Sequence, residues 1–322
     1  MNILFYGFRH GHVDGLYRKA VASARIGKVY CREDDTAARD AAAQRLGVEF
    51  CEASYEQLLE QDVDIVAIGG RYGDRGQAII KALRAGKHVI ADKPLCTSPE
   101  ELSEIRRLSR ANGLKLGCML DLRYMPAAAA AQEALQSGNL GQIRNISFDG
   151  QHCIDYAHRP GWYFEPGMHG GTVNDLAIHG IDLVRHLTGL EFVKADYVRT
   201  WNAYADRTPD FKDCAVFAAR LENGAEVLAD VSYSAPSQAF SLPTYWSFRF
   251  WCEKGLLTFG LGQPDAVIYE EGQPPRTVAG KAPEQDYLED LIDEIESGSD
   301  AFTQSVLDST AAALMLQAAA RD

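Results

Sequence analysis

The chain begins MNILFYGFRHGH (residues 1–12), and this stretch decides the fold class of its first third. Asn2–Tyr6 is a short apolar run typical of a buried strand, and it leads into a turn with two glycines and two histidines. A helical pattern follows near Val13–Ser23. A phosphate-binding turn belongs between a strand and a helix in this order. The stretch therefore predicts the start of a dinucleotide-binding domain.

The alternation of strand and helix continues to about residue 120, which predicts a parallel sheet built from βαβ units. Ser98, Pro99 and the two following glutamates form a typical helix start, because serine caps the helix and acids favour its positive end. The predicted strands are Asn2–Tyr6, Gly27–Cys31, Asp64–Ile68, Lys87–Ala91 and Lys115–Leu120, and the predicted helices are Val13–Ser23, Thr36–Leu46, Arg75–Ala85 and Ser98–Asn112.

Beyond residue 121 the pattern changes to several strand-like runs with few helices between them. The sequence therefore predicts an α/β protein of two domains, a Rossmann dinucleotide-binding domain over 1–121 and an α+β domain over 122–322 with a large, mostly antiparallel open sheet. Too few helices follow Gly189 to cover such a sheet, which predicts a homodimer or homotetramer. The main helices expected here are Pro126–Ser137, Val173–Leu187, Glu284–Glu296 and Thr303–Ala320, and the strands are Ile143–Asp149, Ala215–Leu221, Ala225–Tyr233, Trp246–Cys252 and Gly255–Phe259.

Composition excludes several classes of partner. A net charge of −13 over 322 residues disfavours nucleic acids and anionic membranes, which repel an acidic surface. No apolar run is long enough to cross a bilayer, and the first residues do not resemble a signal peptide. The seven cysteines are scattered and never spaced C-x-x-C, which favours a reducing cytoplasm over disulfides or structural zinc.

The first turn departs from the G-x-G-x-x-G pattern. Only Gly7 fits it, since Arg9 and His12 occupy the second and third glycine places and Gly11 comes one residue early. Arg9 is a candidate for direct contact with a pyrophosphate. The alternative is an ordinary tight turn.

Charges at the end of the second predicted strand bear on the choice of cofactor. A carboxylate at Glu33 can accept hydrogen bonds from an adenosine ribose and repels a 2′-phosphate, which favours NAD over NADP. Arg32 argues the other way, because an arginine here can hold that phosphate, whereas Asp34 and Asp35 again favour NAD. The alternative is a solvated run of charges.

Lys93 follows the fourth predicted strand, in the segment Ala91-Asp92-Lys93-Pro94. The carboxyl end of a parallel strand faces the crevice where such sheets bind ligands. A cation there can stabilise an alkoxide as a hydroxyl loses its proton. The alternative is a surface lysine.

The predicted helix Val173–Leu187 carries one polar stripe. Asp175, His179, Asp182 and His186 recur at i, i+4, i+7 and i+11, so they share a face. An aspartate one turn from a histidine can orient the imidazole and stabilise its protonated form, as a general base requires. A solvated face and a metal site are the alternatives, but no further ligand is apparent in the sequence and no metal is expected.

Four stretches together resemble the glucose–fructose oxidoreductase, inositol dehydrogenase and rhizopine-catabolism (Gfo/Idh/MocA) family. They are Gly86–Leu95, Leu122–Pro126, Gly138–Ile143 and Gly170–Asp182. The resemblance implies that Lys93 contacts substrate and nicotinamide, and that Asp175 and His179 are the catalytic pair. Asp92 stands where the family usually has glutamate, and Gly69–Arg75 replaces the usual Thr/Asn-Pro turn and histidine, with Arg75 in the histidine place.

The resemblance implies an NAD(P)-dependent dehydrogenase that oxidises or reduces a secondary alcohol of a sugar, polyol or related small molecule. Two alternatives use the same scaffold: a glycosidase with tightly held NAD, and a non-enzymatic NAD-binding regulator. The residues expected to bind the cofactor are Gly7, Phe8, Arg9, His10, Glu33, Gly69, Gly70, Arg71, Asp92 and Lys93. Those expected to bind substrate are Lys93, Arg123, Tyr156, Trp162, Asp175 and His179, with His158, Tyr163 and His169 as further candidates.

Overall fold

The computed structural model describes residues 1–237 and 246–321. The chain divides into two compact units, one of residues 1–119, 160–170 and 287–310, the other of residues 120–159, 171–286 and 311–322. The segments 160–170 and 287–310 follow the expected domain boundary at residue 121, yet they pack with the first unit.

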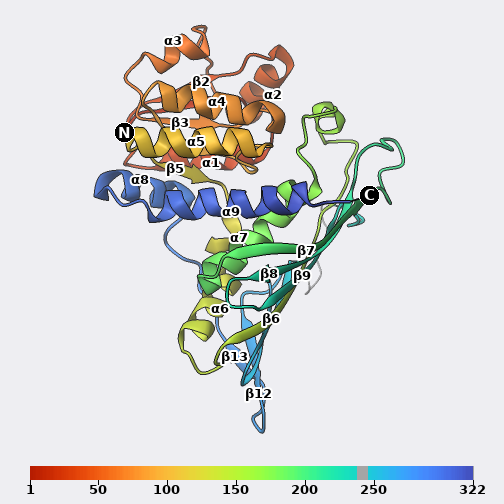
Figure 1. The fold of residues 1–322 in the computed structure, drawn as a ribbon. Coiled ribbons are helices and arrows are strands. Elements are labelled where there is room, and N and C mark those ends of the chain that lie inside the picture. Colours follow the sequence, from red (N-terminus) through yellow and green to blue (C-terminus); the bar gives the residue numbers. More distant parts are fainter. Residues whose placement is uncertain (238–245, 322) are drawn as a thin grey trace. The chain divides into compact units, whose positions relative to one another are not determined.

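The first unit contains a five-stranded parallel sheet in the order β2-β1-β3-β4-β5. Each strand pairs in parallel with its neighbours, which confirms the predicted Rossmann-type sheet. Figure 1 shows helices α4 and α5 lying over these strands. The elements are β1 (Ile3–Tyr6), α1 (His12–Ala22), β2 (Val29–Arg32), α2 (Thr36–Leu46), α3 (Tyr55–Leu59), β3 (Ile65–Ile68), α4 (Tyr72–Arg84), β4 (His88–Ala91), α5 (Pro99–Asn112) and β5 (Leu116–Cys118), with α8 (Tyr287–Ser297) and the start of α9 (Ala301–Ala318).

Local sequence explains where these helices begin and end. The Ser98 hydroxyl accepts a hydrogen bond from the Glu101 N–H at 3.2 Å, and Gly113 ends α5 in the left-handed conformation at φ 64°. Helix α3 was not expected from the sequence. Its signal is the capping box in which Ser54 and Gln57 bond to each other's backbone N–H groups.

The turn after β1 and the turn after β3 are in backbone contact. Gly7 has φ 86°, and a Cβ there would lie 2.6 Å from the Gly70 nitrogen. A Cβ on Gly69 would lie 2.5 Å from the Gly7 oxygen, and the Arg9 N–H donates to the Gly69 oxygen at 3.0 Å. The glycines at 7 and 69 therefore let two ligand-side turns approach more closely than any side chain would allow.

The second unit contains an eight-stranded sheet in the order β13-β12-β11-β10-β6-β9-β8-β7. Among the described residues of this sheet only β6 and β9 pair in parallel, so the prediction of a large, mostly antiparallel sheet is confirmed. Its strands are β6 (Ile143–Gln151), β7 (Phe192–Trp201), β8 (Cys214–Leu221), β9 (Glu226–Ser232), β10 (Ser247–Cys252), β11 (Gly255–Gly260), β12 (Ala266–Glu270) and β13 (Arg276–Val278).

Helices α6 (Pro126–Gln136) and α7 (Ile178–Thr188) cover one face of this sheet, as Figure 1 shows. Gly180 permits the contact, because a Cβ there would lie 2.3 Å from the Phe148 ring on β6. The predicted helix over 173–187 has two parts, a π-helical turn at Val173–Ala177 followed by α7. Single π-helical turns occur frequently at functional sites. None of the helices in the described residues is both long and apolar enough to span a membrane.

Candidate functional site

A cleft of about 370 Å³ lies at the carboxyl ends of β1, β2 and β3. Open parallel sheets bind ligands at this end of their strands. Half of the residues expected to bind a cofactor line the cleft: Gly7, Arg9, Glu33, Gly70 and Arg71. The other lining residues, which sequence reasoning did not assign to the cofactor, are Tyr6, Asp34, Tyr55, Ile68, Asp74, Arg75, Gln77, Ala78 and Lys81.

Glu33 holds the backbone of the turn after β1 by hydrogen bonds. Its side chain is buried (5% exposed), and its two oxygens accept hydrogen bonds from the N–H groups of Phe8 at 2.6 Å and Asp35 at 2.9 Å. The Phe8 side chain is also buried and packs against the Phe50 ring at 5.2 Å between centroids. Glu33 and Phe8 therefore hold the turn in shape, and Glu33 also lines the cleft.

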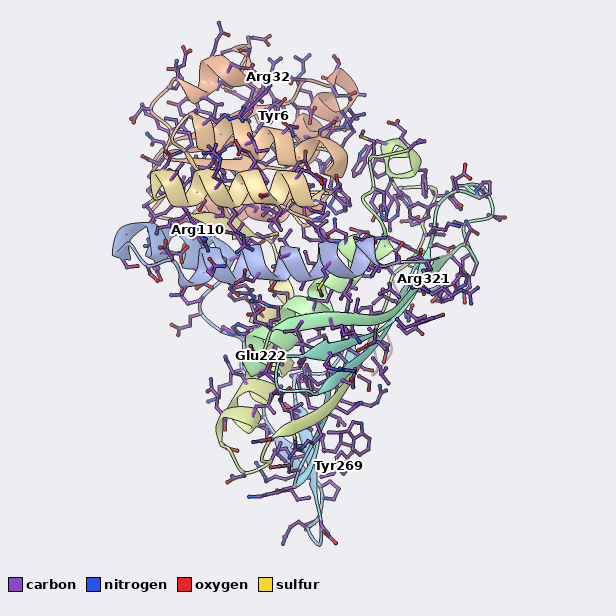
Figure 2. All side chains as sticks on the ribbon, viewed as in Figure 1. Tyr6, Arg32, Arg110, Glu222, Tyr269 and Arg321 are labelled. Carbon is purple, nitrogen blue, oxygen red and sulfur yellow. The ribbon has the colours of Figure 1, made fainter. Side chains whose placement is uncertain are left out.

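Asp34 is the more exposed acid of the cleft wall, with 54% of its side chain accessible. It accepts a hydrogen bond from the Tyr6 hydroxyl at 2.8 Å and from Arg32 Nε at 2.7 Å. Burial and this bond raise the pKa of Tyr6 above its usual value, so Tyr6 stays a neutral donor. Arg32 also donates to the backbone oxygens of Cys51 and Glu52, both at 3.2 Å. Its guanidinium is thus held by acceptors of its own unit, and Figure 2 labels it beside Tyr6.

Asp92 is the centre of a buried network beside the first turn. Its carboxylate oxygens contact His10 Nδ1 at 2.8 Å and His12 Nδ1 at 3.0 Å, and one also accepts from Arg75 at 3.2 Å. The Lys93 N–H donates to Asp92 at 2.7 Å. Burial alone would raise the pKa of Asp92, but His10, His12 and Arg75 together lower it well below its usual value. The expected cofactor residues His10 and Asp92 therefore contact each other, and neither lines the described cleft.

The same three side chains offer potential metal ligands. One ligand atom each of His10, His12 and Asp92 lies within 4.8 Å of the others. The Arg75 guanidinium, however, occupies a position against the Asp92 oxygen that His10 also contacts. A fixed cation beside a carboxylate competes with a metal ion for it. The cluster fits a hydrogen-bond network better than a metal site.

Lys93 is buried (2% exposed) in the first unit, two residues after the end of β4. The surface-lysine alternative is therefore wrong. Its Nζ lies 6.0 Å from the centroid of the Tyr72 ring. Trp162, an expected substrate residue, packs against the same ring at 5.0 Å and donates its indole N–H to the Arg9 oxygen at 3.2 Å.

Asp175 and His179 lie in the second unit, on the π-helical turn and on the first turn of α7. Both are buried, at 0% and 4% exposed, so the alternative of a solvated face is wrong for this part of the stripe. The Tyr233 hydroxyl on the segment after β9 donates to the Asp175 carboxylate. This bond holds Asp175 in place without adding charge.

His179 lies beside an aromatic ring and a carboxylate. The Trp246 ring contacts it edge to face at 5.7 Å between centroids, and Asp121 Oδ1 lies 3.6 Å from its Nδ1. Trp246 itself packs on the backbone of Gly150, where a Cβ would lie 2.4 Å from the indole. A buried imidazole next to a carboxylate can take up a proton, because the carboxylate stabilises the imidazolium that forms.

Asp182, the third residue of the stripe, takes part in a buried ion pair. Arg123, an expected substrate residue, donates to both Asp182 oxygens, with Nε at 2.6 Å. His186, further along α7, has its pKa lowered by burial and by Arg123. Tyr156 bonds to Thr208 at 3.0 Å, outside this helix. Of the predicted stripe, only Asp175 and His179 thus combine burial with a contact that suits acid–base chemistry.

Several residues that the fold brings to these sites are not predicted from the sequence, among them Asp34, Tyr72, Tyr233 and Trp246. In the sequence Asp34 is only a charge near Glu33, and the three aromatic residues carry no motif. A usable signal existed only for Asp34, which directly follows Glu33 at the end of a strand. The three aromatic residues reach their sites through tertiary packing alone.

Two family models match the chain. Residues 17–119 match a model described as "Oxidoreductase family, NAD-binding Rossmann fold", and residues 128–258 match one described as "GFO/IDH/MocA C-terminal domain". The two matches follow each other in the order of the two units. They identify the first as an NAD-binding type of Rossmann domain.

Three relatives illustrate the similarity. The chain is 30% identical over 167 residues to levoglucosan dehydrogenase of Pseudarthrobacter phenanthrenivorans (50% of this chain, 42% of that protein). It is 30% identical over 176 residues to scyllo-inositol 2-dehydrogenase (NAD(+)) of Bacillus subtilis (54% and 50%). The chain thus spans about half the length of these curated relatives. Its fold is similar to that of aldose-aldose oxidoreductase from Caulobacter crescentus, with TM-score 0.79, 17% identity and coverage of 99% and 97%.

Proposed function

The chain belongs to the Gfo/Idh/MocA family of oxidoreductases, and on that premise we propose that it is an NAD-dependent dehydrogenase acting on a secondary alcohol of a sugar or polyol. The observation that carries the proposal is the burial of Asp175 on the π-helical turn and of His179 on α7, which directly follows that turn. The named relatives act on levoglucosan and scyllo-inositol, which supports a polyhydroxylated substrate. The seven cysteines are all free thiols, which supports action in the cytoplasm.

The cleft at β1, β2 and β3 fits a dinucleotide. Its turns are made of glycine backbone, and Glu33 and Asp34 offer acceptors to ribose hydroxyls. Bound NAD would supply the hydride acceptor. Arg9, which pairs with Asp35 at 3.5 Å, and Arg71 are cations of the cleft wall that follow Gly7 and Gly70 closely in the sequence.

In the proposed reaction, His179 takes the hydroxyl proton of the substrate. Asp121, whose Oδ1 lies 3.6 Å from His179 Nδ1, favours the imidazolium that results, because negative charge near an imidazole stabilises its protonated form. The resemblance pairs Asp175 with the same histidine. Lys93 stabilises the alkoxide by its charge. The resemblance implies that Asp175 and His179 are the catalytic pair and that Lys93 contacts substrate and nicotinamide, and the burial of all three side chains supports these assignments.

The direct test measures formation of NADH from NAD⁺ with levoglucosan, scyllo-inositol and a set of aldoses. We expect NADH to accumulate with at least one of them. Cleavage of a glycoside without net NADH would favour the NAD-dependent glycosidase instead. Tight NAD binding without turnover of either kind would favour a regulator.

Cofactor preference gives a second prediction. A 2′-phosphate near Asp34 and Glu33 would face two carboxylates, and like charges in contact cost several kcal/mol. We therefore expect NADH to bind at least about ten-fold more tightly than NADPH, a difference of ~1.4 kcal/mol. Isothermal titration calorimetry measures both constants.

Matched variants test whether Asp34 or Arg32 governs the choice between NADH and NADPH. Asp34→Ala should reduce the preference for NADH, whereas Arg32→Ala should leave it in place because Arg32 is held by Asp34 and two backbone oxygens. A wild type that binds NADPH as tightly as NADH, with the affinity for NADPH lost in Arg32→Ala, would show that Arg32 governs the choice.

We also propose that the chain forms a dimer or tetramer through the outer face of the eight-stranded sheet. Leu228, Ala218 and Tyr197 are cross-strand partners on this face, and Trp251 and Tyr269 lie on it further along the sheet. The four larger side chains are between 44% and 53% exposed, an apolar surface typical of an interface. Figure 2 labels Tyr269.

The expected assembly is tested with a double variant, Leu228→Asp with Trp251→Asp. Light scattering should give a dimer or tetramer for the wild type and a monomer for the variant, because charges on a buried interface are strongly unfavourable. Val21→Asp on α1, where the valine is 58% exposed, is the control and should not change the mass. A monomeric wild type would contradict the proposal.

A further inference from the structure

Tyr72, the first residue of α4, takes part in a hydrogen-bonded chain that no motif assigns. Its side chain is fully buried. Its hydroxyl lies 3.2 Å from His10 Nε2, and His10 Nδ1 lies 2.8 Å from Asp92. Hydrogen bonds thus connect Tyr72 at the start of α4, His10 in the turn after β1 and Asp92 after β4. All three residues belong to the first unit.

The chemistry of the groups determines the direction of these bonds. Asp92 has a pKa well below its usual value, so it is ionised and can only accept. Burial, outweighing the attraction of Asp92, lowers the pKa of His10 to about 4, so His10 is neutral at pH 7. A neutral imidazole that donates from Nδ1 must accept at Nε2. Tyr72 therefore donates its proton to His10, and His10 donates to Asp92.

This order matches the hydroxyl–imidazole–carboxylate arrangement of hydrolase triads, in which the carboxylate fixes the tautomer of the histidine. The consequence for Tyr72 is different, because its proton is directed away from the rest of the site. The phenol oxygen then presents only lone pairs to any other neighbour. A cation is attracted to such an oxygen and to the face of the ring.

Two cations lie over that ring. Arg75 lies 4.7 Å and Lys93 Nζ 6.0 Å from its centroid. The rings of Trp162 and Tyr163 pack on Tyr72 at 5.0 and 5.6 Å, which leaves it little freedom to tilt. We propose that His10 and Asp92 hold Tyr72 as a positioning residue for the Lys93 ammonium.

The proposal rests on the proposed function only in giving Lys93 a catalytic role. Its structural claims are the tautomer of His10 and the position of Lys93. Neither of these depends on the substrate. A metal ion bound by His10, His12 and Asp92 is the competing interpretation, since it would need one His10 nitrogen as a bare ligand. The two interpretations predict different states of the same imidazole.

The first arm of the test is nuclear magnetic resonance of the whole protein at pH 7. With ¹⁵N-labelled histidine, His10 should be the neutral Nδ1–H tautomer. With ¹³C-labelled lysine, the Lys93 Hε resonances, assigned through Lys93→Arg, should shift in Tyr72→Phe and in His10→Gln. Tyr17→Phe removes a phenol that packs on Phe5 in the same unit and should leave these resonances unchanged.

The second arm is kinetic. Tyr72→Phe should lower kcat by about 10²-fold, the effect of a small misplacement of a reacting group, with little change in the dissociation constant of NADH. Tyr17→Phe should match the wild type. Circular dichroism and NADH binding confirm that each variant is folded.

Any one of four results would overturn the proposal. They are an Nε2–H or charged His10, Lys93 resonances that do not shift in Tyr72→Phe, stoichiometric metal in the purified protein, and full kcat in Tyr72→Phe. A wild type inactive on every compound tested would count against the proposed function alone, because the resonance arm still decides the position of Lys93.

Discussion

His179→Asn should keep NADH affinity and lower turnover by about 10²–10⁴-fold, the usual contribution of a general base. Asparagine retains a polar side chain of similar reach but cannot take up a proton at neutral pH. The binding constant should not change, because His179 is not among the residues that line the dinucleotide cleft. Calorimetry with NADH and rates with the best substrate of the panel measure the two quantities.

The matched control is His158→Asn in the same unit. That histidine is 83% exposed and pairs only with Asp155 among the contacts described for it, so its loss should leave turnover unchanged. Asp175→Asn should reduce turnover less than His179→Asn, because it leaves the imidazole in place. Full activity in His179→Asn would show that His179 is not the general base. A loss of turnover in His158→Asn instead would assign the general-base role to His158.

Most of the fold could be predicted because local signals agreed with the tertiary structure. The serine cap and glycine end of α5 appear where the sequence places them, since such caps depend on a few neighbouring residues. The π-helical turn at Val173–Ala177 was not predictable in this way. Its residues fit an ordinary helix, and the irregular turn depends on tertiary contacts such as the bond from Val173 N–H to Gln317 Oε1 at 3.0 Å.

The candidate site shows the same division more clearly. Lys93, Asp175 and His179 could be nominated from strand ends and helical spacing, which are properties of the chain alone. The sequence also points to Glu33 as a ribose ligand, but its burial and the hydrogen bonds that it accepts from the Phe8 and Asp35 N–H groups depend on how the first turn folds back. Tyr72 could not be nominated at all. Its role depends on His10, a partner 62 residues away, and no spacing rule relates the two residues.

Arg75 connects the turn after β3 with the segment that carries Lys93. It stands in the place where the family usually has a histidine. It is fully buried and donates to the backbone oxygens of Gly70 at 2.9 Å, Asp92 at 2.9 Å and Pro94 at 2.7 Å. Two of these oxygens flank Lys93, and the third belongs to the turn that contacts Gly7. A histidine has two ring nitrogens and cannot satisfy the same acceptors. The arginine therefore ties the cofactor turn to the lysine segment within one unit.

Arg75→Met should consequently lower the free energy of unfolding of the first unit by about 3–5 kcal/mol, the usual cost of removing one partner of a buried ion pair. Methionine fills much of the volume, so the loss reports the three orphaned oxygens and the Asp92 carboxylate more than a cavity. Urea unfolding followed by circular dichroism measures this free energy.

Two variants serve as controls. Arg107→Met on α5 removes an exposed arginine paired with Glu104 and should leave the urea midpoint almost unchanged. Arg75→Lys should fall between the two, because a lysine keeps the charge but lacks the planar fork that reaches several acceptors at once. Equal stability of Arg75→Met and the wild type would show that the two histidines and the Lys93 N–H suffice to hold Asp92.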